Sequence, residues 1–141
     1  MVALQPIIVM GMHSTRQIAA DAVIVNEGKI LLVRRGTEPF KGLWALPGGR
    51  LEDDETLEQC CIREAKEESG IDVEIVRLVG VYSDPNRDPR KIIAISYLCK
   101  PAGGKEIPQE GEIQEVKWFP INQLPPLASD HGKMIKDALK I

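Results

Sequence analysis

Two hydrophobic periods alternate along the chain, one of two residues and one of three to four. Runs with the shorter period, rich in valine and isoleucine, predict strands at 17–25, 30–35, 43–46, 72–81, 91–100 and 116–119. Residues 26–29 (NEGK) predict a tight hairpin, and 101–112 a long polar loop. The longer period predicts a helix at 56–69 and a terminal helix capped by Ser129 or Asp130. Strands interleaved with two helices predict an α/β/α sandwich of the α/β class.

The first predicted helix has clear boundaries in the sequence. Thr56 precedes Gln59 by three residues, a spacing that predicts a capping box at the start. Gly70 predicts the end, as the left-handed residue that closes many helices. At about 100° per residue, Glu64 and Glu68 fall on the same face as the apolar positions. These two carboxylates are therefore expected to point toward the body of the protein.

Three carboxylates crowd the second half of this helix. Glu64, Glu67 and Glu68 stand at i, i+3 and i+4, so like charges repel near the negative end of the helix dipole. A divalent cation would neutralise them, and hard oxygen ligands suit magnesium or manganese. The alternative is a solvated face with Arg63 and Lys66 in ordinary ion pairs. Because the carboxylates share the apolar face and follow a Pro-Gly-Gly loop, the metal site is favoured.

The 23 residues from Gly49 to Ile71 match a known family signature. The signature is the Nudix box, G-x5-E-x7-R-E-U-x-E-E-x-G-U with U aliphatic, filled here by Gly49, Glu55, Arg63, Glu64, Ala65, Glu67, Glu68, Gly70 and Ile71. Residues 44–49 (WALPGG) precede the box as in many members. The chain thus resembles the Nudix family over roughly 17–140. The resemblance implies a Nudix fold with a mixed β-sheet, and hydrolysis of a nucleoside diphosphate linked to another moiety.

The resemblance also implies the metal ligands. Glu64 and Glu68 carry over as the principal ligands, because their one-turn spacing lets both reach one ion. The carbonyl of Gly48 is the expected third ligand, since glycine allows the backbone to approach closely. Glu67 is expected to bind a second ion or to orient the attacking water. The expected cofactor is Mg²⁺, or Mn²⁺ in its place.

The general base has two expected locations, because relatives carry it in the box or on a late loop. Glu67 is the box candidate, and Glu112 and Glu110 are the late ones, with Glu112 preferred. Arg63 completes the expected catalytic set. Its expected role is to orient a box carboxylate, Glu55 first of all, and not to bind the substrate.

Residues outside the box are expected to hold the substrate. Arg35 ends the second strand, where the family often carries an arginine that contacts phosphate. Arg34 should point to the opposite face if that strand is regular. Trp44 either packs in the core or stacks on the nucleotide base, and it is included among the substrate-binding candidates.

The segment 83–90, SDPNRDPR, resembles a loop of the Nudix subgroup assigned as ADP-ribose pyrophosphatases. Pro85 stands at the position of the proline that marks this subgroup, and the two prolines of the segment stiffen the loop. Arg87 and Arg90 can then reach a pyrophosphate or a ribose. The alternative is a rigid surface turn with solvated ends. The subgroup commonly continues with Gly-His, whereas this chain continues with Lys-Ile, which weakens the substrate assignment.

Composition limits the other function classes. Residues 52–68 hold eight acids and two bases, a net −6 against −3 for the whole chain, so no concentrated basic face for nucleic acid is expected. Cys60, Cys61 and Cys99 lack metal spacing and are expected as core thiols in a reducing cytoplasm. The apolar stretch 7–12 is too short to span a membrane. The two histidines, His13 and His131, predict only surface or cap positions.

The sequence therefore predicts an N-terminal extension or strand at 1–16 and a Nudix domain at 17–141. The expected activity is Mg²⁺-dependent hydrolysis of ADP-ribose, or a related nucleoside diphosphate derivative, to AMP and ribose 5-phosphate. One alternative is a nucleoside-triphosphate pyrophosphatase that uses the same box, and another is a non-catalytic ligand sensor, against which the intact box argues. The expected partners are a small nucleotide and a second copy of the chain, without nucleic acid or membrane.

Overall fold

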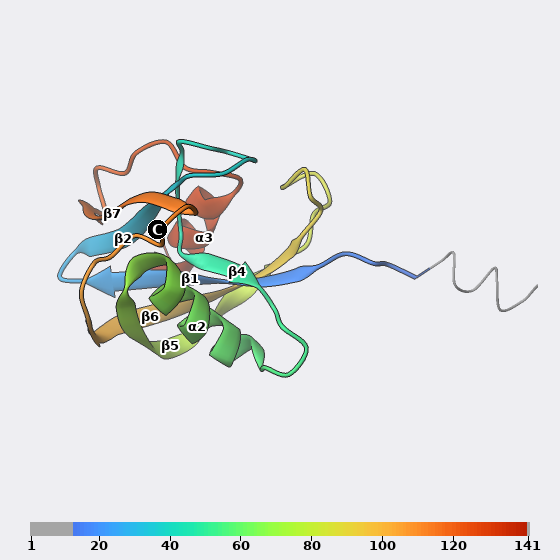
Figure 1. Ribbon diagram of the computed structural model, residues 1–141, viewed down its shortest axis with the longest axis horizontal. Coiled ribbons are helices and arrows are strands. Elements are labelled where there is room, and N and C mark those ends of the chain that lie inside the picture. The colour runs from blue at the N-terminus through green and yellow to red at the C-terminus, as the bar shows by residue number, and fades with distance from the viewer. Residues whose placement is uncertain (1–12, 141) are drawn as a thin grey trace, which may run out of the picture.

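The computed structural model describes residues 13–140. One mixed sheet has a helix on each face (Figure 1). The elements are β1 (Ile18–Asn26), β2 (Lys29–Arg35), β3 (Trp44–Ala45), β4 (Gly48–Arg50), α2 (Leu57–Ser69), β5 (Ile71–Tyr82), β6 (Ile93–Gly104), β7 (Ile113–Pro120) and α3 (His131–Leu139). The strand order is β3-β2-β1-β6-β5, with β4 also paired to β1 and β7 to β2. The predicted α/β/α sandwich with a mixed sheet is confirmed.

Strand β1 is the centre of the sheet because it pairs with three neighbours. It runs parallel to β6, with Ile24 opposite Cys99, and antiparallel to β4, with Asp21 opposite Gly48. Its far end forms the predicted hairpin with β2 through the turn at 26–29. The Pro-Gly-Gly turn is thereby held against the middle of the sheet, next to the C-terminal half of α2.

Alternation along β1 creates two hydrophobic cores. Ile24 packs with Cys61 and Ala65 of α2 on one face of the sheet, and all three side chains are fully buried. Val23 packs on the opposite face with Met134 of α3. Burying a side chain of the size of Ile24 contributes roughly 1.5–3 kcal/mol, so both helices are fixed to the sheet by apolar contact. Of the part of the chain described, no helix is both long and apolar enough to cross a membrane.

The ends of α2 agree with the prediction. Gln59 N donates to Thr56 Oγ1 at 3.1 Å, and Thr56 N donates to Gln59 Oε1 at 2.8 Å, which completes the capping box. Gly70 closes the helix with a φ of 80°, a left-handed value that glycine adopts without strain. The three cysteines are buried free thiols, as predicted, and the sulfurs of Cys61 and Cys99 lie 3.8 Å apart.

Two predicted strand ends were wrong, and the N-cap predicted at Ser129 or Asp130 lies at Asp130 but lacks a side-chain hydrogen bond. β6 continues to Gly104 and β7 begins at Ile113, so the connecting loop is shorter than 101–112. The ladder with β5 extends β6 through a proline, an alanine and two glycines, because pairing requires only backbone groups. At α3, Asp130 is the N-cap but makes no side-chain cap, and Ser129 Oγ donates instead to the carbonyl of Arg87 at 2.6 Å.

The predicted N-terminal extension, 1–16, lies mostly outside the described residues, since 1–12 are not described. The described lead into β1 is anchored by Arg16. Its Nε donates to the carbonyl of Lys91 at 2.7 Å, and its Nη2 donates to the carbonyl of Ser83 at 2.8 Å. The chain thus enters the sheet beside the segment 83–91.

Candidate active site

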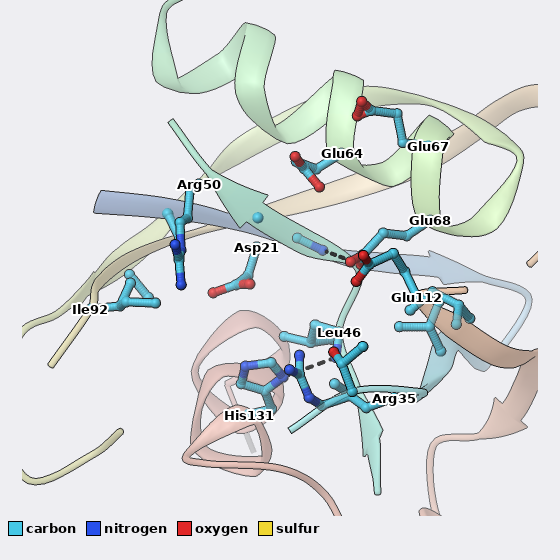
Figure 2. Close-up of a pocket in the computed structure, with 18 of the residues that line it drawn as sticks. Asp21, Arg35, Leu46, Arg50, Glu64, Glu67, Glu68, Ile92, Glu112 and His131 are labelled. Atoms are coloured by element: carbon cyan, nitrogen blue, oxygen red, sulfur yellow. Dashed lines mark hydrogen bonds between the residues drawn. The ribbon is translucent and has the colours of Figure 1, made fainter. Parts of the chain in front are cut away.

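One cavity of about 580 Å³ collects most of the residues that the sequence singles out (Figure 2). Its walls come from β1, β2, the β4 turn, α2, the segment 83–91 and the start of α3. The predicted residues that line it are Arg35, Gly48, Arg63, Glu64, Glu67, Glu68, Arg87, Arg90 and Glu112. Elements that are far apart in the sequence therefore place acidic and basic groups around one space.

The two glycines of the β4 turn are enclosed by carboxylates. A side chain at Gly49 would overlap the carboxylate of Glu64, and one at Gly48 would overlap Asp21 Oδ1. Gly48 N also donates to Glu68 Oε1 at 3.0 Å. Only a residue without Cβ allows this approach. Three carboxylates from β1 and α2 thus gather around a turn whose backbone is open to the cavity.

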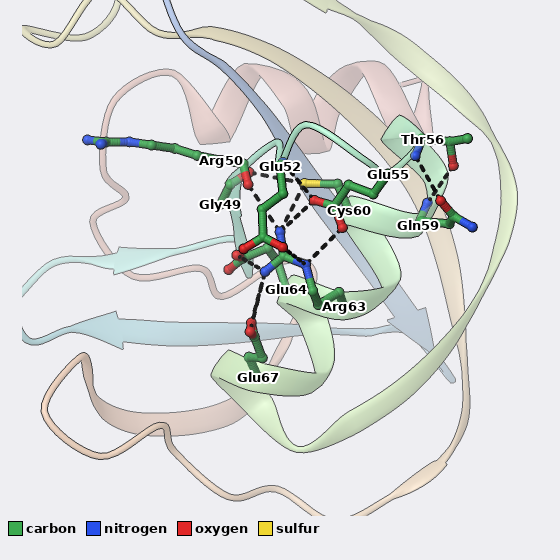
Figure 3. A network of polar contacts seen from close by, with 10 residues as sticks. All are labelled: Gly49, Arg50, Glu52, Glu55, Thr56, Gln59, Cys60, Arg63, Glu64 and Glu67. Carbon is green, nitrogen blue, oxygen red and sulfur yellow. Dashed lines mark hydrogen bonds and ion pairs between the residues drawn. The ribbon is translucent and has the colours of Figure 1, made fainter.

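Arg63 holds the acids of α2 in place (Figure 3). Its Nη2 and Nε donate to the two oxygens of Glu55 at 2.6 and 2.9 Å, the contact expected from the sequence. Its Nη1 donates to Glu64 Oε1 at 2.7 Å and to Glu67 Oε2 at 3.0 Å. One guanidinium therefore neutralises part of the charge of three carboxylates and fixes where they point.

Burial of Glu68 and Glu64 disfavours their charged forms. It raises the pKa of Glu68 to about 8, against the opposing hydrogen bond from Gly48 N. Burial also raises the pKa of Glu64, although Arg63 opposes the shift. A charge that is removed from water needs a counter-charge, and the donors here are all hard oxygens. Glu64, Glu68 and the carbonyl of Gly48 therefore fit a divalent cation.

In this structure the carboxylates of Glu64, Glu67 and Glu68 bind other groups of the protein. Within residues 13–140, no three His, Cys, Asp or Glu side chains are grouped closely enough to hold a metal ion. Glu64 and Glu67 accept hydrogen bonds from Arg63, and Glu68 accepts one from the Gly48 amide. Coordination by this set would need these carboxylates to turn, which the rotatable bonds of glutamate allow.

The basic part of the cavity begins at the end of β2. Arg35 is half-buried in the cavity wall and donates from Nε to the carbonyl of Pro39 at 2.7 Å. Arg34 is exposed and bonds to the carbonyl of Gly42, as strand alternation predicts. Glu112 lies just before β7 on the same cavity, and its charge supports that of Arg35. Glu110 lies outside this cavity.

The arginines of the segment 83–91 are already engaged within the protein. Arg87, whose side chain is only 6% exposed, binds both oxygens of Asp130 at 2.8 to 3.0 Å. Its Nη1 donates to the carbonyl of Ile92 at 2.9 Å. Arg90 binds the buried carboxylate of Asp88 at 2.8 Å. Arg87 was expected to reach a pyrophosphate or a ribose. In this structure its main contact joins the loop to α3, because a buried guanidinium requires a carboxylate partner.

Two predicted substrate ligands do not line this cavity. Trp44 packs edge-on against Phe119, with ring centroids 4.8 Å apart, which is the core position that the sequence left open as an alternative. Pro85 is exposed at the tip of its loop. Lys91 has a φ of 60°, a left-handed conformation that suits the glycine of the subgroup motif at this position. Ile92, at the position of the motif histidine, lines the cavity with an apolar side chain.

Sequence reasoning did not place Asp21 or His131 in the cavity. Asp21 is only 7% exposed and projects from the middle of β1, where burial raises its pKa to about 7. A lone acid inside the apolar run 18–25 was the available signal. The expectation that His131 is only a surface or cap residue was wrong, because it lines the cavity and its Nδ1 accepts a hydrogen bond from Leu46 N at 2.9 Å.

Between neutral and acid pH, the variant Arg63→Met should lose less stability than the wild type. The hydrogen bonds from Arg63 hold the pKa of Glu55 at about 2, below its usual 4.5. A carboxyl whose pKa falls on folding stabilises the protein above its unfolded pKa, and this stabilisation is lost as the pH falls from about 5 toward 2. Thermal unfolding in EDTA from about pH 7 to pH 3 should therefore show a smaller decrease in Tm in Arg63→Met. An equal decrease in Arg63→Met, the wild type and the exposed control Lys29→Met would contradict this.

The α/β/α sandwich thus carries one cavity in which carboxylates that fit a divalent cation lie beside several arginines. Residues 15–138 match the NUDIX domain family, and the chain belongs to this family. Nudix hydrolases generally use divalent metal ions, in agreement with the donor set around Gly48.

Individual relatives agree with this assignment. The chain is 44% identical over 124 residues to the ADP-ribose pyrophosphatase of Methanocaldococcus jannaschii, covering 87% of this chain and 73% of that protein. It is 42% identical over 100 residues to a MutT-like protein of Streptomyces ambofaciens, covering 71% and 60%. The NUDIX domain of Shewanella oneidensis NrtR, solved in complex with ADP ribose, superposes with a TM-score of 0.77 at 29% identity, covering 92% and 90%.

Proposed function

We propose that this protein is a Mg²⁺-dependent ADP-ribose pyrophosphatase, which hydrolyses ADP-ribose to AMP and ribose 5-phosphate. The main support for this proposal is that Arg90 and Arg87 of the SDPNRDPR loop line the same cavity as the acids of the Nudix box. The loop thereby adds two arginines to a cavity that Arg35, Arg50 and Arg63 also line. The relative with 44% identity, an ADP-ribose pyrophosphatase, supports the same substrate.

The reaction breaks one P–O bond of the pyrophosphate. Water attacks one phosphorus, the bridging oxygen leaves with the other phosphate, and the proton of the water passes to a carboxylate. Glu112 or Glu67, both on the cavity, is proposed as that acceptor. Arg35 and Arg90 would bind the phosphate oxygens. A divalent cation held by Glu64, Glu68 and the carbonyl of Gly48 would offset the phosphate charge and lower the pKa of the water.

A substrate panel tests the proposal. ADP-ribose should have a higher kcat/KM than nucleoside triphosphates and dinucleoside polyphosphates, because the loop 83–90 provides bases for a pyrophosphate between two pentoses. Product identification should give AMP and ribose 5-phosphate. A triphosphate with a tenfold higher kcat/KM would instead support the second candidate, a nucleoside-triphosphate pyrophosphatase, which the similarity to a MutT-like protein keeps open. No turnover of any nucleotide with Mg²⁺ or Mn²⁺ would favour the ligand sensor.

We also propose a cytoplasmic homodimer. The sequence 2–12 is apolar, and apolar segments that precede a sheet invite association with a second chain. Light scattering at micromolar concentration should give about twice the chain mass of 15.6 kDa. Deletion of residues 1–15 should weaken both association and substrate affinity. A monomeric full-length protein with full activity would rule the dimer out.

A further inference from the structure

His131 contributes a polar atom to the cavity that neither the family signature nor the loop motif assigns. It is the first residue of α3, and its ring faces the cavity beside Arg35 and Leu46 (Figure 2). The amide N of Leu46 donates to its Nδ1 at 2.9 Å. Among the described residues, no protein group hydrogen-bonds its Nε2. One side of the ring is therefore anchored to the backbone, and the other is available to a ligand.

The anchoring bond determines the tautomer of the ring. A nitrogen that accepts a hydrogen bond from an amide carries no proton, so the proton of the neutral imidazole lies on Nε2. Burial lowers the pKa of His131 to about 4, although the neighbouring carboxylate of Asp130 opposes the shift. The positive end of the α3 dipole also disfavours an imidazolium at this position. At neutral pH the ring is an uncharged donor at Nε2.

The groups around His131 indicate what this donor meets. Arg87 and Asp130 form the adjoining ion pair, and the charges of Arg35 and Asp88 also reach the ring. Arg35 and Arg87 line the same cavity. An anion drawn to these bases would carry oxygens that accept a hydrogen bond from Nε2 without needing a further positive charge.

We propose that His131 contacts the substrate directly, donating a hydrogen bond from Nε2 to a phosphate oxygen. This inference rests on the proposed phosphoanhydride hydrolysis, but not on ADP-ribose as the particular substrate. The Leu46 amide fixes the ring, and Asp130, the preceding residue, ties the start of α3 to the loop 83–91 through Arg87. Sequence-distant elements thereby hold this donor in position before the substrate arrives.

Two substitutions separate a substrate contact from a structural role. The glutamine of His131→Gln would place an amide donor near the position of Nε2. The shorter asparagine of His131→Asn would keep an acceptor for the Leu46 amide and lose the donor at the tip. With the best substrate of the wild-type panel, His131→Asn should lower kcat/KM about tenfold with little change in Tm.

The conservative variant and an exposed residue of the same helix serve as controls. His131→Gln should retain a kcat/KM within about threefold of the wild type, because it restores the donor. Lys136→Gln, at an exposed position of α3, is the matched control and should leave kcat/KM unchanged.

The reverse result, with His131→Asn active and His131→Gln impaired, would show that only the Leu46 contact matters and would overturn the proposal. A wild-type kcat/KM in both variants would also overturn the proposal. Because the substrate is chosen by turnover in the wild type, a failure of ADP-ribose in the panel is seen separately from a failure of His131.

NMR gives a readout that does not depend on turnover. The chain has two histidines, so ¹⁵N spectra of His13→Gln assign the signals of His131 directly. We expect an unprotonated Nδ1 and a protonated Nε2 from about pH 5 to pH 9, with Nε2 shifting on addition of AMP and not of adenosine. A protonated Nδ1, or an equal shift with adenosine, would overturn the proposal.

Discussion

Replacing Glu68 by glutamine is expected to lower kcat by at least about two orders of magnitude while the protein still folds. The carboxylate lies against the Gly48 amide, one helical turn from Glu64, and would supply a charged ligand to the divalent cation. An amide keeps the size and the hydrogen bond but not the charge that offsets the phosphates in the transition state. Steady-state kinetics at saturating Mg²⁺ measure the loss.

Folding of this variant should improve in the absence of metal. Burial raises the pKa of Glu68 to about 8, so at neutral pH the folded state keeps this carboxyl protonated while the unfolded state ionises it. The resulting loss of stability grows as the pH rises from the unfolded pKa toward 8. In EDTA, Glu68→Gln should therefore have a higher Tm than the wild type at about pH 8. Glu58→Gln, exposed on the same helix, is the control and should change neither kcat nor this pH dependence. Near-normal turnover by Glu68→Gln would exclude Glu68 as a metal ligand.

Gly48→Ala is expected to reduce both stability and activity. The added methyl group would overlap Asp21 Oδ1 and lie 2.5 Å from the backbone oxygen of Ala20, which cannot move without disturbing β1. Overpacking of this kind destabilises a protein by about 1–3 kcal/mol. Displacing the turn also moves the Gly48 amide from Glu68, and a shift of about 1 Å at a reacting centre can reduce the rate about 100-fold. Chemical unfolding and steady-state kinetics measure the two effects.

Two other glycines provide a graded comparison. In Gly49→Ala the atoms nearest to the added methyl group would be those of the flexible Glu64 carboxylate, so activity should fall with a smaller loss of stability than in Gly48→Ala. Gly132→Ala on α3 has no atom nearer than Leu127 Cδ1 at 3.7 Å, and it should be neutral or stabilise by up to about 1 kcal/mol. Equal stability of Gly48→Ala and Gly132→Ala would mean that the turn tolerates a side chain.

Local patterns were enough to predict the helix that carries the acids. The capping box at Thr56, the end at Gly70 and the positions of Glu64 and Glu68 all depend on spacings within about one helical turn. The same holds for the β1–β2 hairpin, whose turn is encoded in four residues. The fold class followed from the order of these elements, and the Nudix signature lies within one continuous segment.

The tertiary structure alone decided the rest of the cavity. Asp21 faces Gly48 because of the β1–β4 register, and His131 reaches Leu46 across 85 positions of the chain. Arg87 is bound by Asp130 and not left free for the substrate, and Trp44 packs against Phe119 outside the cavity. Each of these contacts joins residues that are distant in sequence. Hydrophobic periodicity determines which face of an element is buried, but long-range pairing and packing determine which polar groups meet there.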